Sequence, residues 1–281
     1  MDIIQLLKVI VLGIVEGLTE WLPISSTTHI KLIDDIIRFN ASDSFKEVFI
    51  VCIQLGPMLA VAITYFQKLN PFDPAKNSIK KRATLLLWLK IIIAALPAAI
   101  LGLLLDDWID AHLSSTLINS FMLILYGIIF IVYENMNKNK RPEIEKSGQI
   151  GYQTALYIGM CQVLALIPGT SRSGVTILGA MALGCSRSAA VEFSFLIGIP
   201  ILFGASALKV LKYAVSIHFH FDSMELVYLL AGCLVSFIVA AYTISYFLNW
   251  IKKHDFKPFG YYRIALGIIT LIWFGLGALV K

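Results

Sequence analysis

The sequence predicts an all-α integral membrane protein with about six transmembrane helices and two re-entrant helix hairpins, arranged as an inverted repeat. Composition is the first reason: of 281 residues, 58% are hydrophobic and only 15% are charged, whereas a soluble globular domain is roughly 25% charged. The second reason is the number and length of the apolar runs. The third is that two apolar regions are interrupted midway by proline and small polar residues. We therefore expect a membrane domain that contains two re-entrant helix hairpins in addition to its transmembrane helices.

Six apolar stretches are long enough to cross a hydrocarbon core, which takes about 20 helical residues. We expect these spans at 45–66, 84–105, 115–134, 188–210, 225–248 and 261–280. The first apolar run of the chain has neither a basic n-region nor a small-x-small cleavage site. We therefore expect it to remain in the mature protein.

The two interrupted regions cover residues 3–37 and 151–184. Their interruptions are Pro23-Ile-Ser-Ser-Thr-Thr28 and Pro168-Gly-Thr-Ser-Arg-Ser-Gly174. Each half is too short to span a bilayer, and non-helical backbone at membrane depth occurs only where it is buried in protein or lines a wet cavity. We interpret both regions as re-entrant hairpins whose tips carry the function.

Loop charge predicts the orientation, because cytoplasmic loops are enriched in Lys and Arg. The loops 68–82, 134–148 and 250–260 are basic and are predicted to be cytoplasmic, whereas the acidic stretch 106–110 is predicted to face outward. With this count the first hairpin enters from outside and the second from the cytoplasm. Opposite directions are what an inverted repeat requires.

A weak internal similarity supports the same arrangement. Gly13-Ile-Val-Glu16-Gly-Leu18 resembles Gly159-Met-Cys-Gln162-Val-Leu164, and each is followed by a proline and a Ser/Thr cluster. The chain has no linker or low-complexity tract. We therefore treat 1–281 as a single membrane domain, with inverted halves at roughly 1–134 and 150–281.

Charge and cysteine usage exclude other classes of protein. The formal net charge is +5, but the basic residues cluster between apolar runs, as membrane anchors do. Nucleic acid is therefore not an expected partner. The four cysteines have no C-x-x-C spacing, and we expect neither a disulfide nor a zinc site.

Two carboxylates in the first hairpin are the first candidates for chemistry. Glu16 and Glu20 are four residues apart, which puts both on one face of a helix. Both would be solvated if the segment lay at the surface, but ionisable groups at membrane depth are functional candidates by default. Two carboxylates without a Cys or His cluster suit a hard divalent cation, Mg²⁺ or Ca²⁺.

Hydroxyl groups and an imidazole follow these carboxylates. Ser26 and His29 are three residues apart at the expected start of the returning helix, so the imidazole could reach the hydroxyl and act as the base that a hydroxyl nucleophile needs. Ser25 is equally well explained as a helix cap. A helix N-terminus also favours an anion, so we place Ser25 and Thr27 among the candidate substrate-binding residues.

The second tip carries the opposite charge. Arg172 is flanked by Ser171 and Ser173, with Thr176 one turn further on, and we place all four among the candidate substrate-binding residues. A guanidinium matches a phosphate with paired donors, and an Arg at this depth needs an anionic partner, which is either a carboxylate of the first hairpin or a phosphate. The alternative is an Arg that extends to the cytoplasmic interface.

These motifs resemble those of a known family. Glu16-Gly-Leu-Thr-Glu20-Trp-Leu-Pro-Ile-Ser-Ser-Thr-Thr-His29 and Pro168-Gly-Thr-Ser-Arg-Ser-Gly-Val-Thr176 are similar to the two signature motifs of the undecaprenyl-diphosphate phosphatases of the bacitracin-resistance type. The resemblance implies a multi-pass enzyme of the bacterial inner membrane that removes one phosphate from a long-chain isoprenoid diphosphate with a divalent cation. It also implies two inverted repeats with re-entrant hairpins. We expect the site to open to the periplasmic face, and consider a homodimer as the oligomer.

Carried over to this sequence, the resemblance assigns Glu16 and Glu20 to metal binding and to the activation of water or of a nucleophile, and we place Glu20 among the catalytic residues. It assigns Arg172 to the diphosphate, and Ser26 and His29 to phosphoryl transfer. Whether Ser26, His29 or a water attacks phosphorus stays open. The family usually has Gly where this chain has Thr28, so either Thr28 adopts an ordinary conformation or the local geometry differs.

A transporter of an anionic lipid or solute is the alternative function, because inverted repeats with broken helices are a transporter architecture. The pairing of Ser26 and His29 beside two carboxylates favours the enzyme. Moving a phosphate across a membrane needs neither a nucleophile nor a base.

Overall fold

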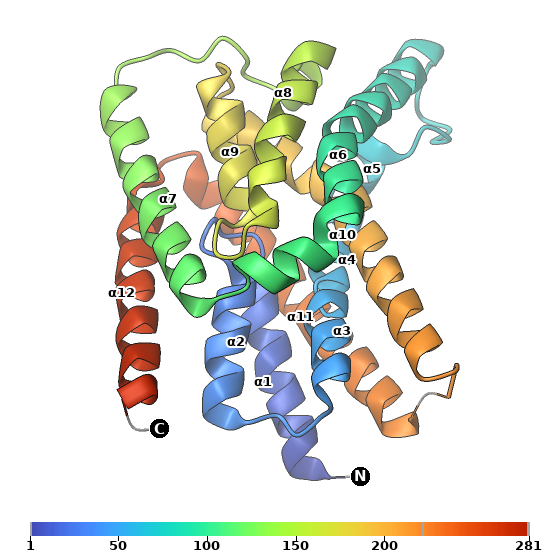
Figure 1. Ribbon diagram of the computed structural model, residues 1–281. Coiled ribbons are helices and arrows are strands. Elements are labelled where there is room, and N and C mark those ends of the chain that lie inside the picture. Colours follow the sequence, from blue (N-terminus) through green and yellow to red (C-terminus); the bar gives the residue numbers. More distant parts are fainter. Residues whose placement is uncertain (1, 221, 280–281) are drawn as a thin grey trace.

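The computed structural model describes residues 2–220 and 222–279, with the side chains of residue 110 and of residues 274–279 excepted. This part of the chain is built of helices and contains no β-strand. Figure 1 shows most of the helices running along one common direction. The predicted all-α class is confirmed.

The helices have the following bounds: α1 Ile3–Thr19, α2 Ser26–Ile37, α3 Asp43–Cys52, α4 Leu55–Thr64, α5 Phe66–Leu69, α6 Ser78–Leu113, α7 Thr116–Met136, α8 Tyr152–Val163, α9 Arg172–Ala182, α10 Arg187–Ser216, α11 Ser223–Ile251 and α12 Lys257–Leu279. Two short 3₁₀ helices, Ser147–Gln149 and Leu164–Leu166, precede and follow α8.

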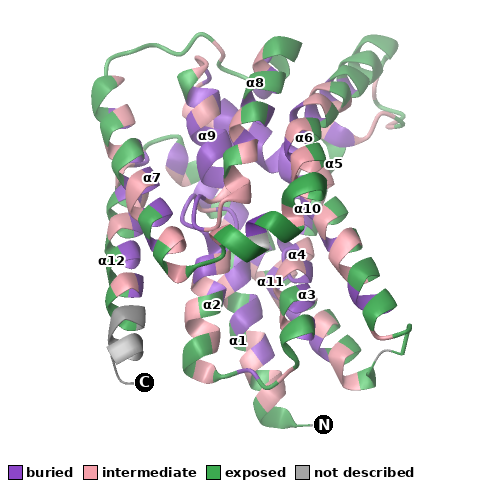
Figure 2. Ribbon diagram, viewed as in Figure 1, coloured by how far each residue is buried: buried purple, intermediate pink, exposed green. Residues whose placement is uncertain are grey.

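Within the described residues, five segments are long and apolar enough to cross a membrane: Asp43–Thr64, Ser78–Ile109, Thr116–Met136, Arg187–Ser216 and Ser223–Ile251. They coincide with five of the six predicted spans. The sixth, 261–280, falls on α12, and residue 280 lies outside the described residues. Many large apolar side chains point outward, among them Leu104 and Leu230, which are more than two-thirds exposed. Such an apolar surface suits a bilayer rather than water, and Figure 2 shows the buried residues concentrated on the inner faces.

The two interrupted regions form paired short helices, α1 with α2 and α8 with α9. Even α1, with 17 residues, is roughly 25 Å long at 1.5 Å per residue, which is shorter than a hydrocarbon core. In Figure 1 the two pairs approach from opposite ends of the molecule, and their connecting turns lie together at mid-height. The helix breaks fall at residues 20–25 and 164–171, close to the predicted interruptions.

Close backbone contacts fix both pairs against the long helices. A Cβ on Gly13 or Gly17 of α1 would lie 2.9 or 2.6 Å from a carbonyl oxygen of α11. A Cβ on Gly159 of α8 would lie 2.4 Å from the carbonyl oxygen of Ala94 in α6. Glycine is required at these positions because any side chain would push the helices apart. The hairpin tips are therefore held from behind by rigid helices.

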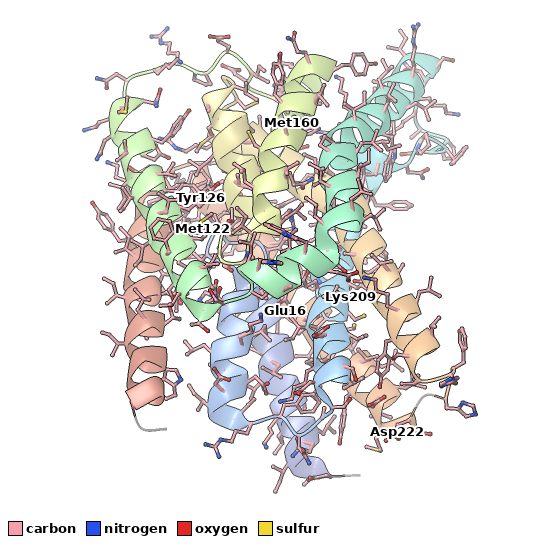
Figure 3. The ribbon with its side chains drawn as sticks, in the orientation of Figure 1. Glu16, Met122, Tyr126, Met160, Lys209 and Asp222 are labelled. Atoms are coloured by element: carbon pink, nitrogen blue, oxygen red, sulfur yellow. The ribbon has the colours of Figure 1, made fainter. Side chains whose placement is uncertain are left out.

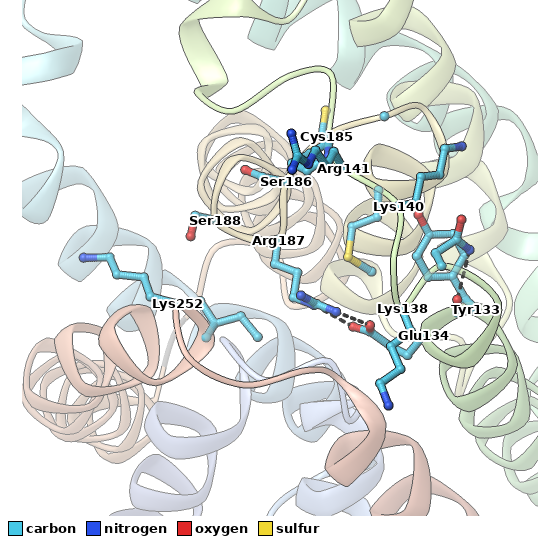
Figure 4. Close-up of a pocket in the computed structure, with 15 residues that line it drawn as sticks. Tyr133, Glu134, Lys138, Lys140, Arg141, Cys185, Ser186, Arg187, Ser188 and Lys252 are labelled. Carbon is cyan, nitrogen blue, oxygen red and sulfur yellow. Dashed lines mark hydrogen bonds and ion pairs between the residues drawn. The ribbon is translucent and has the colours of Figure 1, made fainter.

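The basic loops gather at one end of the molecule. Lys68 donates a hydrogen bond of 2.7 Å to Ser147, which joins the first basic loop to the second. A cavity of about 240 Å³ at the same end is lined by residues of the second basic loop and by Lys252 of the third. At its edge Arg187 forms a two-point ion pair with the carboxylate of Glu134 (Figure 4).

Candidate active site

The two hairpin tips meet through one ion pair and one hydroxyl. Arg172, the first residue of α9, donates from Nη2 to Oε1 of Glu20 at 2.7 Å. The hydroxyl of Ser26, the first residue of α2, donates to Oε2 of the same carboxylate at 2.6 Å. Both side chains of the ion pair are about nine-tenths buried. Of the two partners considered for Arg172, the structure contains the carboxylate of the first hairpin.

Glu16 lies one turn before Glu20 and is completely buried at the centre of the molecule (Figure 3). The two carboxylates interact with each other, as their four-residue spacing predicts, but neither oxygen of Glu16 has a hydrogen-bond partner. A buried carboxylate without a donor is costly. The prediction that both carboxylates lie inside the protein, and not in water, is confirmed.

Unpaired polar atoms concentrate at these hairpins. In the described part of the chain, the buried side-chain nitrogen and oxygen atoms without a partner are Glu16 Oε1 and Oε2, Trp21 Nε1, Gln162 Oε1, Thr170 Oγ1 and Arg172 Nε. All of them belong to the two hairpins. Buried polar groups are nearly always hydrogen-bonded in native proteins. A cluster of exceptions therefore indicates a place that accommodates a polar ligand, an ion or water.

Each tip ends on a serine in a strained conformation. Ser25 and Ser171 both have φ of 70°, and each directly precedes a helix. Ser25 follows Glu16 by nine residues, and Ser171 follows Gln162 by nine residues. Non-glycine residues with positive φ cost about 1 to 3 kcal/mol and cluster at functional sites. The Ser171 hydroxyl caps α9 by accepting from the backbone N–H of Gly174 at 3.2 Å. Ser25 does not cap α2 through its side chain; its hydroxyl is bonded to that of Thr28 at 2.9 Å.

The remaining predicted substrate-binding residues are placed differently from one another. Thr27 is half-buried in the first turn of α2. Ser173 donates to the carbonyl oxygen of Leu22 at 3.2 Å, so it too bridges the tips. Thr176 is fully buried, and its hydroxyl is bonded to Ser194 of α10 at 2.6 Å. Thr176 thus supports the start of α9 from behind rather than lying at the open side of the tip.

The prediction that the imidazole of His29 contacts the hydroxyl of Ser26 was wrong. The two ring nitrogens of His29 are bonded to the carbonyl oxygen of Ser25 at 2.7 Å and to the hydroxyl of Tyr262 at 2.8 Å, and Ser26 donates to Glu20. Because a carbonyl only accepts, His29 donates from Nδ1, and Nε2 then accepts from Tyr262 in a neutral ring. Helical geometry turns His29 away from Ser26 and back toward the carbonyl one turn earlier.

Thr28 adopts an ordinary conformation inside α2. The positive φ lies at Ser25 instead, so a β-branched residue at position 28 is not strained. The Thr28 hydroxyl donates to Asn119 Oδ1 at 2.9 Å. Of the two alternatives considered for Thr28, the ordinary conformation is the one found.

Three residues of the site come from helices outside the hairpins. Asn119 of α7 accepts from Thr28, and its backbone lies so close to Gly169 that a Cβ there would be 2.3 Å from the Asn119 carbonyl oxygen. Tyr262 and Arg263 are neighbours on α12; Tyr262 holds His29, and Arg263 donates to carbonyl oxygens of both tips. An Arg within an apolar span is a signal in the sequence that would have pointed to Arg263.

The described part of the chain forms no dedicated protein cage for a metal. Among the described residues no group of three or more His, Cys, Asp or Glu side chains comes together. The pair Glu16 and Glu20 nevertheless fits a hard cation that keeps water and substrate oxygens as its other ligands, because the oxygens of Glu16 have no donor of their own.

The comparisons with known proteins agree on one family. The family model described as bacitracin resistance protein BacA matches residues 9–269. An undecaprenyl-diphosphatase of Enterococcus faecalis is 51% identical over 97% of this chain and 98% of its own length. An undecaprenyl-diphosphatase of Desulfitobacterium hafniense is 50% identical over 98% of each chain, and undecaprenyl-diphosphatase 1 of Clostridioides difficile is 50% identical over 97% of each.

Proposed function

Because this chain belongs to the bacitracin resistance protein BacA family, we propose that the meeting point of its two hairpin tips is where it hydrolyses undecaprenyl diphosphate. The chain is a membrane hydrolase that converts this lipid to undecaprenyl phosphate and inorganic phosphate. The reaction recycles the lipid carrier of cell-wall synthesis, and bacitracin resistance is the property named in the family description.

One observation carries the choice of site. An Arg, two carboxylates and the N-termini of α2 and α9 converge where the unpaired buried polar atoms lie. Phosphoryl transfer needs mainly positioning and neutralisation of charge. The Arg and the two helix N-termini, with their free N–H groups, supply positive charge for a diphosphate. The undecaprenyl tail would lie along the apolar helices, with its diphosphate at the tips.

We propose that Glu16 and Glu20 hold a divalent cation, Mg²⁺ or Ca²⁺. Two adjacent buried carboxylates repel each other unless a proton or a cation lies between them, and Arg172 already neutralises part of the charge on Glu20. When bound, the cation would neutralise charge on the diphosphate oxygens.

Ser26 is the hydroxyl best placed to react. Its proton points to Glu20 over 2.6 Å, a distance suited to general-base catalysis. We propose that Ser26 Oγ attacks the terminal phosphorus as Glu20 accepts the proton. A new O–P bond forms, the bond from phosphorus to the bridging oxygen breaks, and undecaprenyl phosphate leaves. Water would then release inorganic phosphate from Ser26. His29, whose ring nitrogens are both occupied, would hold the strained Ser25 turn in place.

Phosphate release from the purified protein in detergent tests the function. The wild type should release one phosphate per undecaprenyl diphosphate, and Ser26→Ala should be at least about 100-fold slower. Absence of phosphate release by the wild type, combined with movement of the lipid between leaflets of a vesicle, would favour the transporter instead. A trapped phosphoserine at Ser26 would support direct attack, whereas a fully active Ser26→Ala would leave water as the nucleophile.

Gly198 allows an indirect test of Arg172, since a Cβ on Gly198 would lie 2.6 Å from Nη1 of Arg172. The clash is with the end of a flexible side chain, so Gly198→Ala should fold but displace the guanidinium from Glu20. We expect a loss of turnover of about 10-fold or more, because a small displacement of reacting groups strongly lowers the rate. Gly204→Ala in the same helix meets nothing within 4 Å and should keep full activity. Equal activity of the two variants would contradict the role of Arg172.

We further propose that the hairpins are re-entrant, that they form an inverted repeat, and that their site opens to the periplasmic face. Support comes from the opposite directions of the two hairpins in Figure 1 and from the matching strained serines. The gathering of basic loops at one end agrees with the positive-inside rule.

Accessibility to an impermeant thiol reagent in intact cells tests this orientation. Asp107→Cys, at a position whose side chain is 98% exposed, should react, whereas Lys81→Cys in the first basic loop should not. The native Cys185 should add little background, since it is buried and burial raises its pKa to about 11. The reverse labelling pattern would overturn the periplasmic opening.

A further inference from the structure

Arg263 of α12 is a fully buried residue whose hydrogen bonds all go to backbone carbonyl oxygens. Nη1 donates to Pro23 of the first hairpin tip at 3.0 Å. Nη2 donates to Gly169 at 2.8 Å and to Thr170 at 3.0 Å, both in the second tip. One guanidinium therefore joins the two tips, which are far apart in the sequence.

The same side chain also binds α7. Its Nε and Nη2 donate over 3.4 Å to the carbonyl oxygens of Leu123 and Met122. The guanidinium carbon lies 5.7 Å from the ring centroid of Tyr126, within the range of a cation–π contact. Figure 3 places Met122 and Tyr126 of α7 at the level of the tips. Arg263 thus connects four segments: both tips, α7 and α12.

The charge of Arg263 is unusual, because burying a guanidinium without a carboxylate is expensive. Its contacts within the described chain are carbonyl oxygens and one aromatic ring, and include no carboxylate. A Cβ on Gly174, in the first turn of α9, would lie 3.3 Å from Arg263 Nη1. The positive charge is therefore directly behind the helix N-terminus that faces the proposed diphosphate site.

We propose that Arg263 is a positioning residue for the phosphatase reaction, an inference that rests on the proposed function. It fixes the two tips against each other, so that Glu20 and Ser26 of one face Arg172 of the other. It also adds positive charge behind the tips, in support of a bound diphosphate.

Lysine cannot replace this geometry. The planar guanidinium presents donors on separate edges, one directed to Pro23 and another to Gly169 and Thr170. A lysine ammonium keeps the charge but concentrates its donors at one point. Arg263→Lys should therefore lower kcat by about 10-fold to 100-fold, the cost of misplacing reacting groups by about 1 Å. KM should change much less, because Arg263 does not itself contact the substrate.

The experiment measures kcat, KM and melting temperature of the full-length protein in detergent with undecaprenyl diphosphate. Arg263→Lys is compared with Arg187→Lys, which alters the ion pair of a partly exposed Arg with the buried Glu134 at the basic end (Figure 4). Arg187→Lys should lower the melting temperature but keep kcat per folded molecule. If Arg263→Lys is not recovered folded, Tyr126→Leu leaves Arg263 in place, removes the ring beside it, and should lower kcat several-fold.

Each outcome separates the inference from the function. An active wild type with near-wild-type kcat in folded Arg263→Lys would overturn the inference and leave the function standing. So would wild-type kcat in Tyr126→Leu, where that variant is needed. A loss in Arg263→Lys that disappears after correction for the folded fraction would make the residue purely structural. A wild type that releases no phosphate would contradict the function itself.

Discussion

Replacing Glu16 or Glu20 by Gln should lower the turnover of undecaprenyl diphosphate by at least about 100-fold, the lower end of what a positioned base or charge contributes. Glutamine keeps the shape of the side chain and removes the charge. Neither oxygen of Glu16 has a hydrogen-bond partner, so Glu16→Gln breaks no contact that the fold requires. Glu20→Gln keeps one oxygen, which can accept from Arg172 or from Ser26, whereas the carboxylate accepts from each of them with a separate oxygen. The amide can neither accept a proton from Ser26 nor hold a cation as strongly.

Steady-state phosphate release and melting temperature, measured together, check this result. Glu47→Gln is the matched control, because Glu47 is largely exposed and forms a 3.8 Å ion pair with Lys209; its turnover should be unchanged. An excess of chelator should lower the turnover of the wild type as strongly as the two substitutions do. Full activity in chelator would remove the cation from the proposal, and an active Glu16→Gln would remove Glu16 from the site.

The positions of the hairpin tips were predictable because local chemistry determines them. Proline, glycine and clustered serines interrupt apolar runs at residues 23–28 and 168–174, and in combination these residues disfavour the interior of a helix. The helices accordingly break at 20–25 and 164–171. The importance of the two buried carboxylates and of Arg172 was also predictable, since an ionisable residue within an apolar segment is by default a candidate for function.

The contacts around the tips were not predictable, because they join segments far apart in the chain. Nothing local to Pro23 or Gly169 indicates that both bind Arg263, more than ninety residues further along the sequence. The pairing of Ser26 with His29 was inferred from spacing alone. It failed because a helical turn can direct either side chain to other partners, here Glu20 and Tyr262.

Arg172 should tolerate neither Lys nor Ala. Its Nη1 and Nη2 are bonded to the Ser194 carbonyl oxygen and to Glu20, while its Nε is buried without a partner. The guanidinium thus has a donor left for a phosphate oxygen while it remains anchored to both α10 and the first hairpin. Lysine preserves the charge, but its ammonium cannot make contacts in three directions from one planar group.

We expect Arg172→Lys to lose about 30-fold to 1000-fold in turnover, equivalent to roughly 2 to 4 kcal/mol in the transition state, and Arg172→Ala to lose more. An Arg that only extended to the membrane interface would be replaced freely by Lys, because a flexible ammonium reaches that interface equally well. The burial of Arg172 at the meeting point of the tips argues against that alternative. The measurement is the turnover of both variants per folded molecule, alongside their melting temperatures. Near-wild-type turnover of Arg172→Lys would show that charge alone suffices, and a large fall in stability with normal turnover would limit Arg172 to holding the two tips together.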